Sequence, residues 1–369
     1  SNMKARLIIA LSALFLPLMG IRAQENLKLI VGTYTDGASK GIYSFDFNQH
    51  SGTVKALHSL NIENPSYLTL SKDGNHIYAV SEKNDTTATV STVKFDKHTG
   101  AMQLINTQRT YGEDPCYIAT NGKIVLTANY SGGSMSIFPL NAEGILQPMS
   151  RQIKGGIGGP DADRQAIPHI HCTRFAPDGK HIYATDFSAD RLLQIEIKKD
   201  KSTLGKAKIL VKVPRDSGPR HIEYSSDGRF LYIMSELSGN VTVFDLQNKN
   251  KKMLQEIQSD EVNARGGADI HISPDGRFLY SSNRLKNDGI AIFKVNTETG
   301  MLTKVGYQLT GIHPRNFNIT PNGKFLLCAC RDSNIIQVFE INRSTGLLTD
   351  THHDIHVDKP VCIAFCSGH

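Results

Sequence analysis

The chain has 369 residues, of which 39% are hydrophobic and 21% are charged, a composition that is ordinary for a globular protein and excludes wholesale disorder. Its formal net charge is +6, but Lys4, Arg6 and Arg22 lie in an N-terminal segment without acids, and the other 38 basic residues against 35 acidic ones leave only +3. So small a balance gives no argument for binding to nucleic acid or to a membrane surface.

The N-terminal segment predicts a cleaved export signal over residues 1–23. Residues 1–2 precede a methionine and are typical of a cloning scar. A short basic stretch is followed by an apolar run over residues 7–19, which is too short to span a bilayer. Ile21 and Ala23 suit a cleavage site before Gln24, although a buried first helix is the alternative. Cleavage would leave residues 24–369 as one exported, periplasmic domain, and no membrane span is expected in it.

A ten-residue pattern that ends in a turn glycine recurs along the whole chain. It occurs at residues 65–74, 219–228, 267–276 and 314–323, and related copies end at Gly122 and Gly179. The spacings between successive turn glycines are 48, 57, 49, 48 and 47 residues. In one copy we expect strands at 268–273, 277–283, 290–295 and 301–309, with turns between them. Four short antiparallel strands in about 47 residues are the size of one propeller blade, and helical periodicity is absent.

The count of repeats predicts how the ring closes. Six copies carry the glycine turn, and a seventh first-strand pattern stands alone at residues 360–365. Its continuation is at the other end of the chain, in strands expected at 28–33 and 41–47 with a turn around Gly52. We therefore expect one blade to be shared between the chain ends, which leaves no open sheet edge. The predicted fold is all-β, a single seven-bladed propeller with four antiparallel strands per blade.

Six cysteines in an exported protein raise the question of disulfides. Most of them lie inside apolar, strand-like runs, and no CxxC motif is present. Cys328 and Cys330 would point to the same face of one strand, so they could not readily bridge each other. The sequence favours buried free thiols at all six positions, which are Cys116, Cys172, Cys328, Cys330, Cys362 and Cys366.

The register of the repeat gathers functional side chains at one mouth of the central channel. Strands one and two of each blade form a hairpin, so strand one starts where strand two ends. The residues that start strand one are Ser66, Cys116, His171, Arg220, Ala268, Arg315 and Val361. The next residues along are Tyr67, Tyr117, Cys172, His221, Asp269, Asn316 and Cys362. The residues that end strand two are Glu82, Tyr130, Phe187, Glu236, Arg284 and Arg331.

Several arginines around few carboxylates predict a pocket for an oxygen-rich anionic ligand with an acid–base group, because guanidinium binds carboxylate or phosphate bidentately. A solvated channel of mutually neutralising charges is the alternative. The 57-residue spacing comes from a glycine-rich insertion at residues 154–165, which precedes His171 and is expected to cover this mouth as a lid. It lacks the strand–loop–helix setting and the following Lys-Ser/Thr of a phosphate-binding loop.

No other motif predicts a metal or cofactor site. His352, His353 and His356 lie in one loop without the Cys or carboxylate spacing of a zinc site, and we expect them to be solvated. A GxSxG nucleophile motif and Asp-rich calcium loops are also absent from the sequence. We therefore expect no metal and no cofactor.

Eight short segments together resemble the family of propeller-type lactonases, which includes bacterial 6-phosphogluconolactonases and a fungal branch of carboxy-muconate cyclising enzymes. These segments are residues 31–34, 129–134, 164–165 with 169–171, 218–221, 235–237, 268–271, 283–284 and 314–317. They follow one another in order, and the resemblance covers essentially the whole chain after the predicted cleavage site.

The resemblance implies the activity and the residues that carry it. The implied reaction is hydrolysis of a sugar lactone, of the 6-phosphogluconolactone type, to the aldonate without a metal, by His171, Arg220, Glu236 and Arg284. Glu236 or His171 is expected as the general base, and Arg220 and Arg284 are suited to stabilise the oxyanion. Arg315 is expected to bind the phosphate or other distal oxygens. Further substrate contacts are expected from Arg331, Glu82, Tyr130, His221, Asp269 and His169.

Two other functions stay open, a lactonising isomerase that uses the same groups in reverse and a non-catalytic propeller that binds a ligand or a protein. The expected partner of an enzyme here is a small anionic sugar lactone. The family's sugar-phosphate lactonase is expected in the cytoplasm, so the predicted export signal puts a phosphorylated substrate in question. The oligomeric state is not predicted by the sequence.

Overall fold

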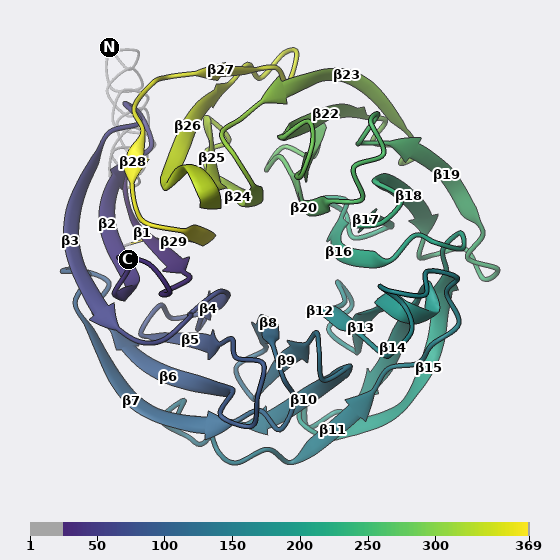
Figure 1. The fold of residues 1–369 in the computed structure, drawn as a ribbon, viewed down its shortest axis with the longest axis horizontal. Coiled ribbons are helices and arrows are strands. Elements are labelled where there is room, and N and C mark those ends of the chain that lie inside the picture. The colour runs from purple at the N-terminus through teal and green to yellow at the C-terminus, as the bar shows by residue number, and fades with distance from the viewer. Residues whose placement is uncertain (1–24, 368–369) are drawn as a thin grey trace, which may run out of the picture.

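The computed structural model describes residues 25–367, and these form seven antiparallel sheets arranged as blades around a central channel (Figure 1). The predicted seven-bladed propeller is confirmed. Each blade has four main strands, which run in sequence order from the channel outward in blades 1–6, whereas β29 is innermost in blade 7. Among the described residues, blade 6 alone carries one more short strand, β28, beside β26. The predicted export signal at residues 1–23 lies outside the described residues.

The first four complete blades follow the repeat. Blade 1 consists of β4 (Leu68–Leu70), β5 (His76–Ser81), β6 (Thr89–Phe95) and β7 (Met102–Arg109). Blade 2 consists of β8 (Pro115–Thr120), β9 (Ile124–Asn129), β10 (Ser134–Pro139) and β11 (Arg151–Lys154). Blade 3 consists of β12 (Ile170–Phe175), β13 (His181–Asp186), β14 (Arg191–Ile197) and β15 (Leu204–Lys212). Blade 4 consists of β16 (Pro219–Tyr224), β17 (Phe230–Ser235), β18 (Asn240–Asp245) and β19 (Met253–Gln258).

The remaining blades complete the ring. Blade 5 consists of β20 (Gly267–Ile272), β21 (Phe278–Asn283), β22 (Gly289–Val295) and β23 (Leu302–Leu309). Blade 6 consists of β24 (Pro314–Ile319), β25 (Phe325–Cys330), β26 (Ile335–Ile341), β27 (Leu348–Asp350) and β28 (Ile355–His356). Blade 7 consists of β29 (Pro360–Ser367), β1 (Asn26–Thr33), β2 (Gly41–Asn48) and β3 (Val54–Asn61). The only helical turns among residues 25–367 are two 3-10 turns, η1 (Phe187–Ala189) and η2 (Arg331–Ser333).

Blade 7 joins the two ends of the chain, as the count of repeats predicted. Its innermost strand, β29, comes from the C-terminus and pairs antiparallel with β1 from the N-terminal part, for example Val31 opposite Ile363 and Leu29 opposite Phe365. Both edges of β1 are therefore paired, one with β2 and the other with β29, and the ring has no open edge at the junction.

The turn glycines of the repeat are required because the backbone at these positions is left-handed. The six glycines have φ between +66° and +85°, a region that residues with a Cβ rarely adopt. At Gly276 a Cβ would also lie 2.2 Å from the side-chain oxygen of Ser226. The regular spacing of these glycines therefore marks the hairpin between strands one and two of each complete blade: Gly74, Gly122, Gly179, Gly228, Gly276 and Gly323.

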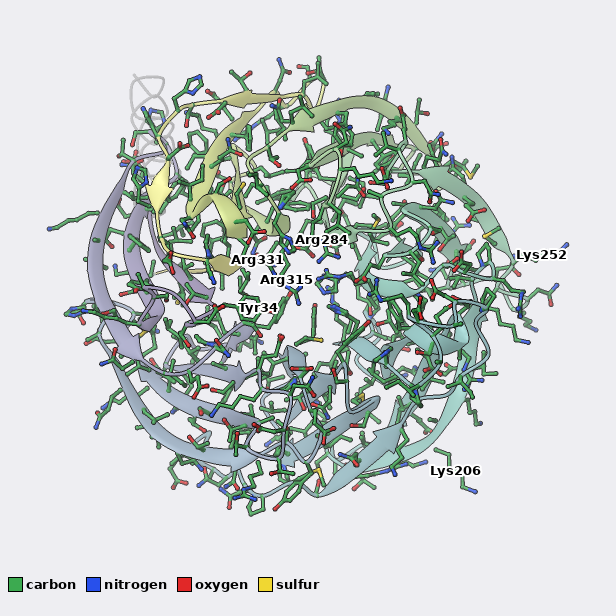
Figure 2. The ribbon with its side chains drawn as sticks, in the orientation of Figure 1. Tyr34, Lys206, Lys252, Arg284, Arg315 and Arg331 are labelled. Carbon is green, nitrogen blue, oxygen red and sulfur yellow. The ribbon has the colours of Figure 1, made fainter. Side chains whose placement is uncertain are left out.

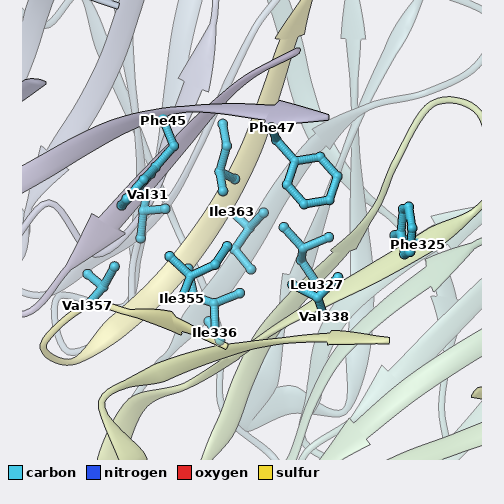
Figure 3. Packing of buried hydrophobic residues seen from close by; sticks show 12 residues of the cluster. Val31, Phe45, Phe47, Phe325, Leu327, Ile336, Val338, Ile355, Val357 and Ile363 are labelled. Atoms are coloured by element: carbon cyan, nitrogen blue, oxygen red, sulfur yellow. The ribbon is translucent and has the colours of Figure 1, made fainter. Parts of the chain in front are cut away.

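The core lies between neighbouring blades rather than inside any one of them. The second strands are covered on both faces, so β17 (FLYIMS) is buried at every position, whereas every residue of the outer strand β19 is half-buried or exposed. Between blades 6 and 7, Phe47 packs edge-on against Phe325, with ring centroids 5.9 Å apart (Figure 3). All six cysteines are buried and free.

Within residues 25–367, no helix is long and apolar enough to cross a bilayer.

Candidate active site

A cavity of about 620 Å³ opens at one mouth of the channel, where the first strands begin and the second strands end. Its lining combines cationic, anionic and aromatic side chains, several of which gather around the channel in Figure 2. Seven of the lining residues were predicted from the sequence as catalytic or substrate-binding residues, which are Glu82, Tyr130, His171, Glu236, Arg284, Arg315 and Arg331. The other lining residues are Tyr34, Asp36, Asn64, Asp114, Cys116, Arg164, Asp332 and Lys359.

Glu236 is the centre of an arginine cluster on one side of the cavity. It directly follows β17, and its carboxylate lies 3.2 Å from Nε of Arg220 and 3.4 Å from Nη2 of Arg284. Arg164 donates to its second oxygen from the insertion before β12. Burial alone would raise the pKa of Glu236, but the charges of these three arginines outweigh it and lower the pKa to about 2. Glu236 is therefore a permanent carboxylate at neutral pH.

The arginine cluster carries more positive charge than Glu236 neutralises. Arg220 is only 1% exposed and lies directly behind the cavity wall. Arg284 is held by backbone carbonyls, with Nε 3.0 Å from Gly266 O and Nη2 3.1 Å from Gly267 O. Burial and the neighbouring Arg220 lower the pKa of Arg284 to about 9. Three guanidinium groups around one carboxylate leave a net positive site, which suits an oxygen atom that gains negative charge.

Glu82 lies in a different setting at the same mouth. It follows β5 in blade 1, and it accepts hydrogen bonds from Tyr34 Oη at 3.0 Å and from Ser66 Oγ at 2.8 Å. Among the described residues, no Lys, Arg or His nitrogen lies within 4.0 Å of its carboxylate, although the Arg315 guanidinium is near the ring of Tyr34, 5.7 Å from its centroid. Burial raises the pKa of Glu82, and this effect outweighs the charge of Arg315.

His171 lines the cavity between the two carboxylates and is a neutral imidazole. Its Nδ1 lies 3.7 Å from Sγ of Cys116. Burial lowers the pKa of His171 well below 6.5, and the charges of Arg220 and Arg315 lower it further. In this state the ring can accept or donate a hydrogen bond, but it binds a proton only weakly.

Three residues that the sequence predicted as substrate contacts do not line the cavity. His169 stacks on the ring of Tyr130, with centroids 4.0 Å apart, and so supports the wall from behind. His221 and Asp269 lie one residue deeper along strand one, where His221 Nδ1 is 2.8 Å from Asp269 Oδ1.

This deeper layer forms the floor of the cavity. It also contains the stacked pair Tyr67 and Tyr117, with centroids 4.2 Å apart, and Asn316, which donates to Asp269 at 3.0 Å. Tyr67, Tyr117 and Asn316 line a separate cavity of about 460 Å³ on the other side of this layer. The two cavities share no lining residue.

A set of residues at the rim of the cavity was not predicted from the sequence. Asn64, Asp114 and Lys359 line the cavity and have left-handed backbones, with φ of +44°, +53° and +46°. Each immediately precedes a proline that leads into strand one of its blade. An X-Pro dipeptide before strand one was therefore the signal, and His313, with φ of +65° before Pro314, belongs to the same column.

Arg164 was also missed as a site residue, although the insertion that carries it was expected at this mouth. Its guanidinium reaches Glu236 and the hydroxyl of Tyr130, the latter at 3.1 Å. The insertion is anchored rather than free. Asp161 pairs with Arg265 at 2.7 Å, and Gln165 donates to the buried Asp190 at 2.8 Å.

The described part of the chain contains no group of three His, Cys, Asp or Glu side chains that could hold a metal ion.

Comparisons with known proteins agree on one family. A family model described as lactonase, seven-bladed β-propeller matches residues 28–365. A 6-phosphogluconolactonase of Formosa agariphila is 35% identical over 342 residues, which cover 89% of this chain and 97% of that protein. A 6-phosphogluconolactonase of Bacillus subtilis is 32% identical and covers 91% of this chain and 97% of its own length.

Solved structures show the same fold at high similarity. A Bacteroides uniformis protein is 58% identical, with a TM-score of 0.91, and the match covers 93% of this chain and 100% of that chain. The periplasmic gluconolactonase of Pseudomonas aeruginosa is 31% identical, with a TM-score of 0.87 and the same coverage of 93% and 100%.

Proposed function

Because the chain belongs to the lactonase family of seven-bladed β-propellers, we propose that it hydrolyses a sugar lactone to the open aldonate in the cavity around Glu236. The observation that carries this proposal is the surplus of positive charge in the buried arginine cluster. Names of the relatives support it, since they include 6-phosphogluconolactonases and a gluconolactonase.

Opening a lactone needs groups that bind the negative charge of the transition state. Water adds to the carbonyl carbon, and the carbonyl oxygen gains charge until the ring oxygen leaves. Arg284 lines the cavity, and backbone carbonyls already hold its guanidinium in place. Arg220 lies behind the wall and adds its positive charge through its contact with Glu236, so little reorganisation is needed when the charge appears. Arg315 has no carboxylate partner within 4.0 Å among the described residues and is free to bind distal oxygens or a phosphate of the substrate.

The surroundings of Glu236 and His171 argue against the expectation that either one carries the proton. Three arginines hold Glu236 as a carboxylate with a pKa of about 2, so it is a very weak base. Burial and nearby positive charge make His171 a weak base as well. We assign Glu236 to holding the arginines in place and His171 to hydrogen bonding with the bound lactone.

The test is a panel of aldonolactones with and without a phosphate group, followed by pH-stat titration with spontaneous hydrolysis subtracted. We expect acid release with at least one member of the panel. Arg284→Ala should reduce kcat/KM on the order of 10²–10³-fold, because one preorganised donor is lost. Arg343→Ala, which removes an exposed arginine far from the cavity, should keep the parent activity.

The two rival functions predict other results. A lactonising isomerase would convert an unsaturated dicarboxylate to a lactone and show no net hydrolysis of aldonolactones. A non-catalytic binding propeller would bind members of the panel but release no acid, and Arg284→Ala would then change affinity alone.

A further inference from the structure

The cavity contains two buried glutamates in opposite electrostatic settings. Glu236 belongs to blade 4 and Glu82 to blade 1, so they are three blades apart on a ring of seven and face each other across the channel. Glu236 has three guanidinium partners, whereas Glu82 has two hydroxyl donors and no charged partner within 4.0 Å in the described chain. Two carboxyl groups with such different surroundings can take different roles in one reaction.

We propose that Glu82 is the general base and general acid of this pocket, taking a proton from the attacking water and returning it to the ring oxygen that leaves. This inference rests on the proposed lactone hydrolysis. It assigns the proton transfer to a residue that the sequence analysis expected only to bind substrate.

The position of Glu82 supports this role. Its carboxylate lines the same cavity as the arginine cluster, on the opposite side of the channel, so it is available to a water that attacks a lactone whose carbonyl oxygen is bound by the arginines. Tyr34 Oη donates to both carboxylate oxygens, at 3.1 Å and 3.0 Å, and Ser66 Oγ donates to Oε1 at 2.8 Å. These bonds fix the carboxylate without neutralising it, so it remains able to accept a proton.

The acidity of Glu82 fits the same role. Burial raises its pKa above the ordinary value of 4.5. A carboxylate with a raised pKa is a stronger base than Glu236, and its protonated form still gives the proton up readily to a leaving alkoxide.

The proposed steps balance in atoms and electrons. The water oxygen bonds to the carbonyl carbon while one water proton moves to Glu82, and the carbonyl π electrons move to the oxygen bound by the arginines. The intermediate then collapses, the bond between the carbonyl carbon and the ring oxygen breaks, and the ring oxygen keeps its electron pair. It takes the proton from Glu82, which becomes a carboxylate again. The aldonic acid product releases its own proton to solvent.

Tyr34 and Ser66 are positioning residues in this scheme. Each donates to the ionised form of Glu82 and so lowers its pKa. Tyr34→Phe or Ser66→Ala should therefore raise the pKa of Glu82. Since the ionised carboxylate is the active form, the acidic limb of the kcat profile should move to higher pH in both variants.

The experiment compares Glu82→Gln with Glu298→Gln, a matched change at an exposed turn of blade 5. On the best lactone of the panel, Glu82→Gln should lose on the order of 10²–10⁴-fold in kcat with little change in KM, and the acidic limb should disappear. Glu298→Gln should behave as the parent. Glu82→Ala should regain part of its rate in formate, because a free carboxylate can then occupy the vacated space and accept the proton.

The outcomes separate this inference from the function on which it rests. If the parent opens no lactone, the proposed function fails and Glu82 has no reaction to serve. If the parent is active and Glu82→Gln keeps its rate and its acidic limb, the function stands and Glu82 is not the proton carrier. If Glu82→Gln does not fold, the other variants decide. The inference is overturned if the acidic limb of Tyr34→Phe and of Ser66→Ala stays at the pH of the parent and formate restores no activity to Glu82→Ala.

Discussion

At the scale of single residues, the negative charge of Glu236 affects the pKa of its neighbour Arg284. Burial and Arg220 lower the pKa of Arg284 to about 9, and the negative charge of Glu236 raises it and so limits this shift. Glu236 thus holds the pKa of Arg284 above the value that burial and Arg220 alone would leave. A substitution there should alter the acidity of the cluster as well as its geometry.

Glu236→Gln should therefore move the alkaline limb of the pH profile. In the parent, kcat/KM should fall above about pH 9 as Arg284 loses its proton and can no longer bind the developing oxyanion. Without the carboxylate, the pKa of Arg284 should fall further, so the limb should shift to lower pH. Rates between pH 6 and 10, corrected for spontaneous hydrolysis, would measure this shift. An unchanged limb would mean that another group controls it.

The site could be predicted from the sequence only where side chains follow the strand period. His171 and Arg315, which are the second residues of β12 and β24, face the cavity, and the hairpin register was enough to place them. The next residue lies in the floor layer instead, so His221 and Asp269 were expected one layer too high. Residues before strand one, such as Lys359, have a left-handed backbone that strand alternation does not predict, and only the proline that follows marks their position.

At the scale of elements, the insertion between β11 and β12 is a fixed wall of the site. Gln165 is 1% exposed and donates to Phe187 O at 3.0 Å and to Asp190 at 2.8 Å. Gly156 N donates to Asp186 at 3.0 Å at the start of the insertion. These anchors present Arg164 to Glu236 before any ligand arrives, so the insertion that was expected to cover the mouth as a lid forms part of its wall.

Arg164→Ala and Gln165→Ala should both weaken catalysis. The first removes a guanidinium group of the site, and the second removes the anchor that positions that group. Loss of Arg164 removes one of three guanidinium groups from Glu236, and we expect about a tenfold to hundredfold loss in kcat/KM.

Gln165→Ala leaves Asp190 without one donor and should cost about 1–3 kcal/mol of folding stability. It should also raise KM, because Arg164 loses its anchor. Steady-state kinetics and thermal melts test both, and an unchanged KM in Gln165→Ala would argue against the anchoring role.

At the scale of the whole molecule, the sequence repeat was enough to predict most of the fold. Glycine turns at nearly constant spacing gave the number of blades, and the orphan pattern at residues 360–365 gave the closure. The short strand β28 was not predicted, because two residues beside β26 leave no periodic signal. The contacts of the insertion were not predicted either, since they depend on blades 3, 4 and 5 meeting in space.

Export remains a proposal for the whole chain, carried by residues 1–23 of the sequence. Expressed in a bacterium with a periplasm, the full chain should yield a periplasmic product whose N-terminus is near Gln24. Intact-mass measurement of the periplasmic fraction would establish the cleavage site. A product that stays in the cytoplasm or retains Lys4 and Arg6 would contradict export.

The closure of the ring should dominate the stability of the molecule. A chain that ends at residue 359 lacks β29, so β1 becomes an open edge and the apolar faces of blades 6 and 1 lose their cover. We expect this chain to melt at a clearly lower temperature and to associate in solution. A peptide of residues 360–367, added in excess, should bind the open edge of β1 as a strand and restore part of the melting temperature. A scrambled peptide of the same composition should not. If the truncated chain melts as the parent does, the shared blade is not what holds the ring closed.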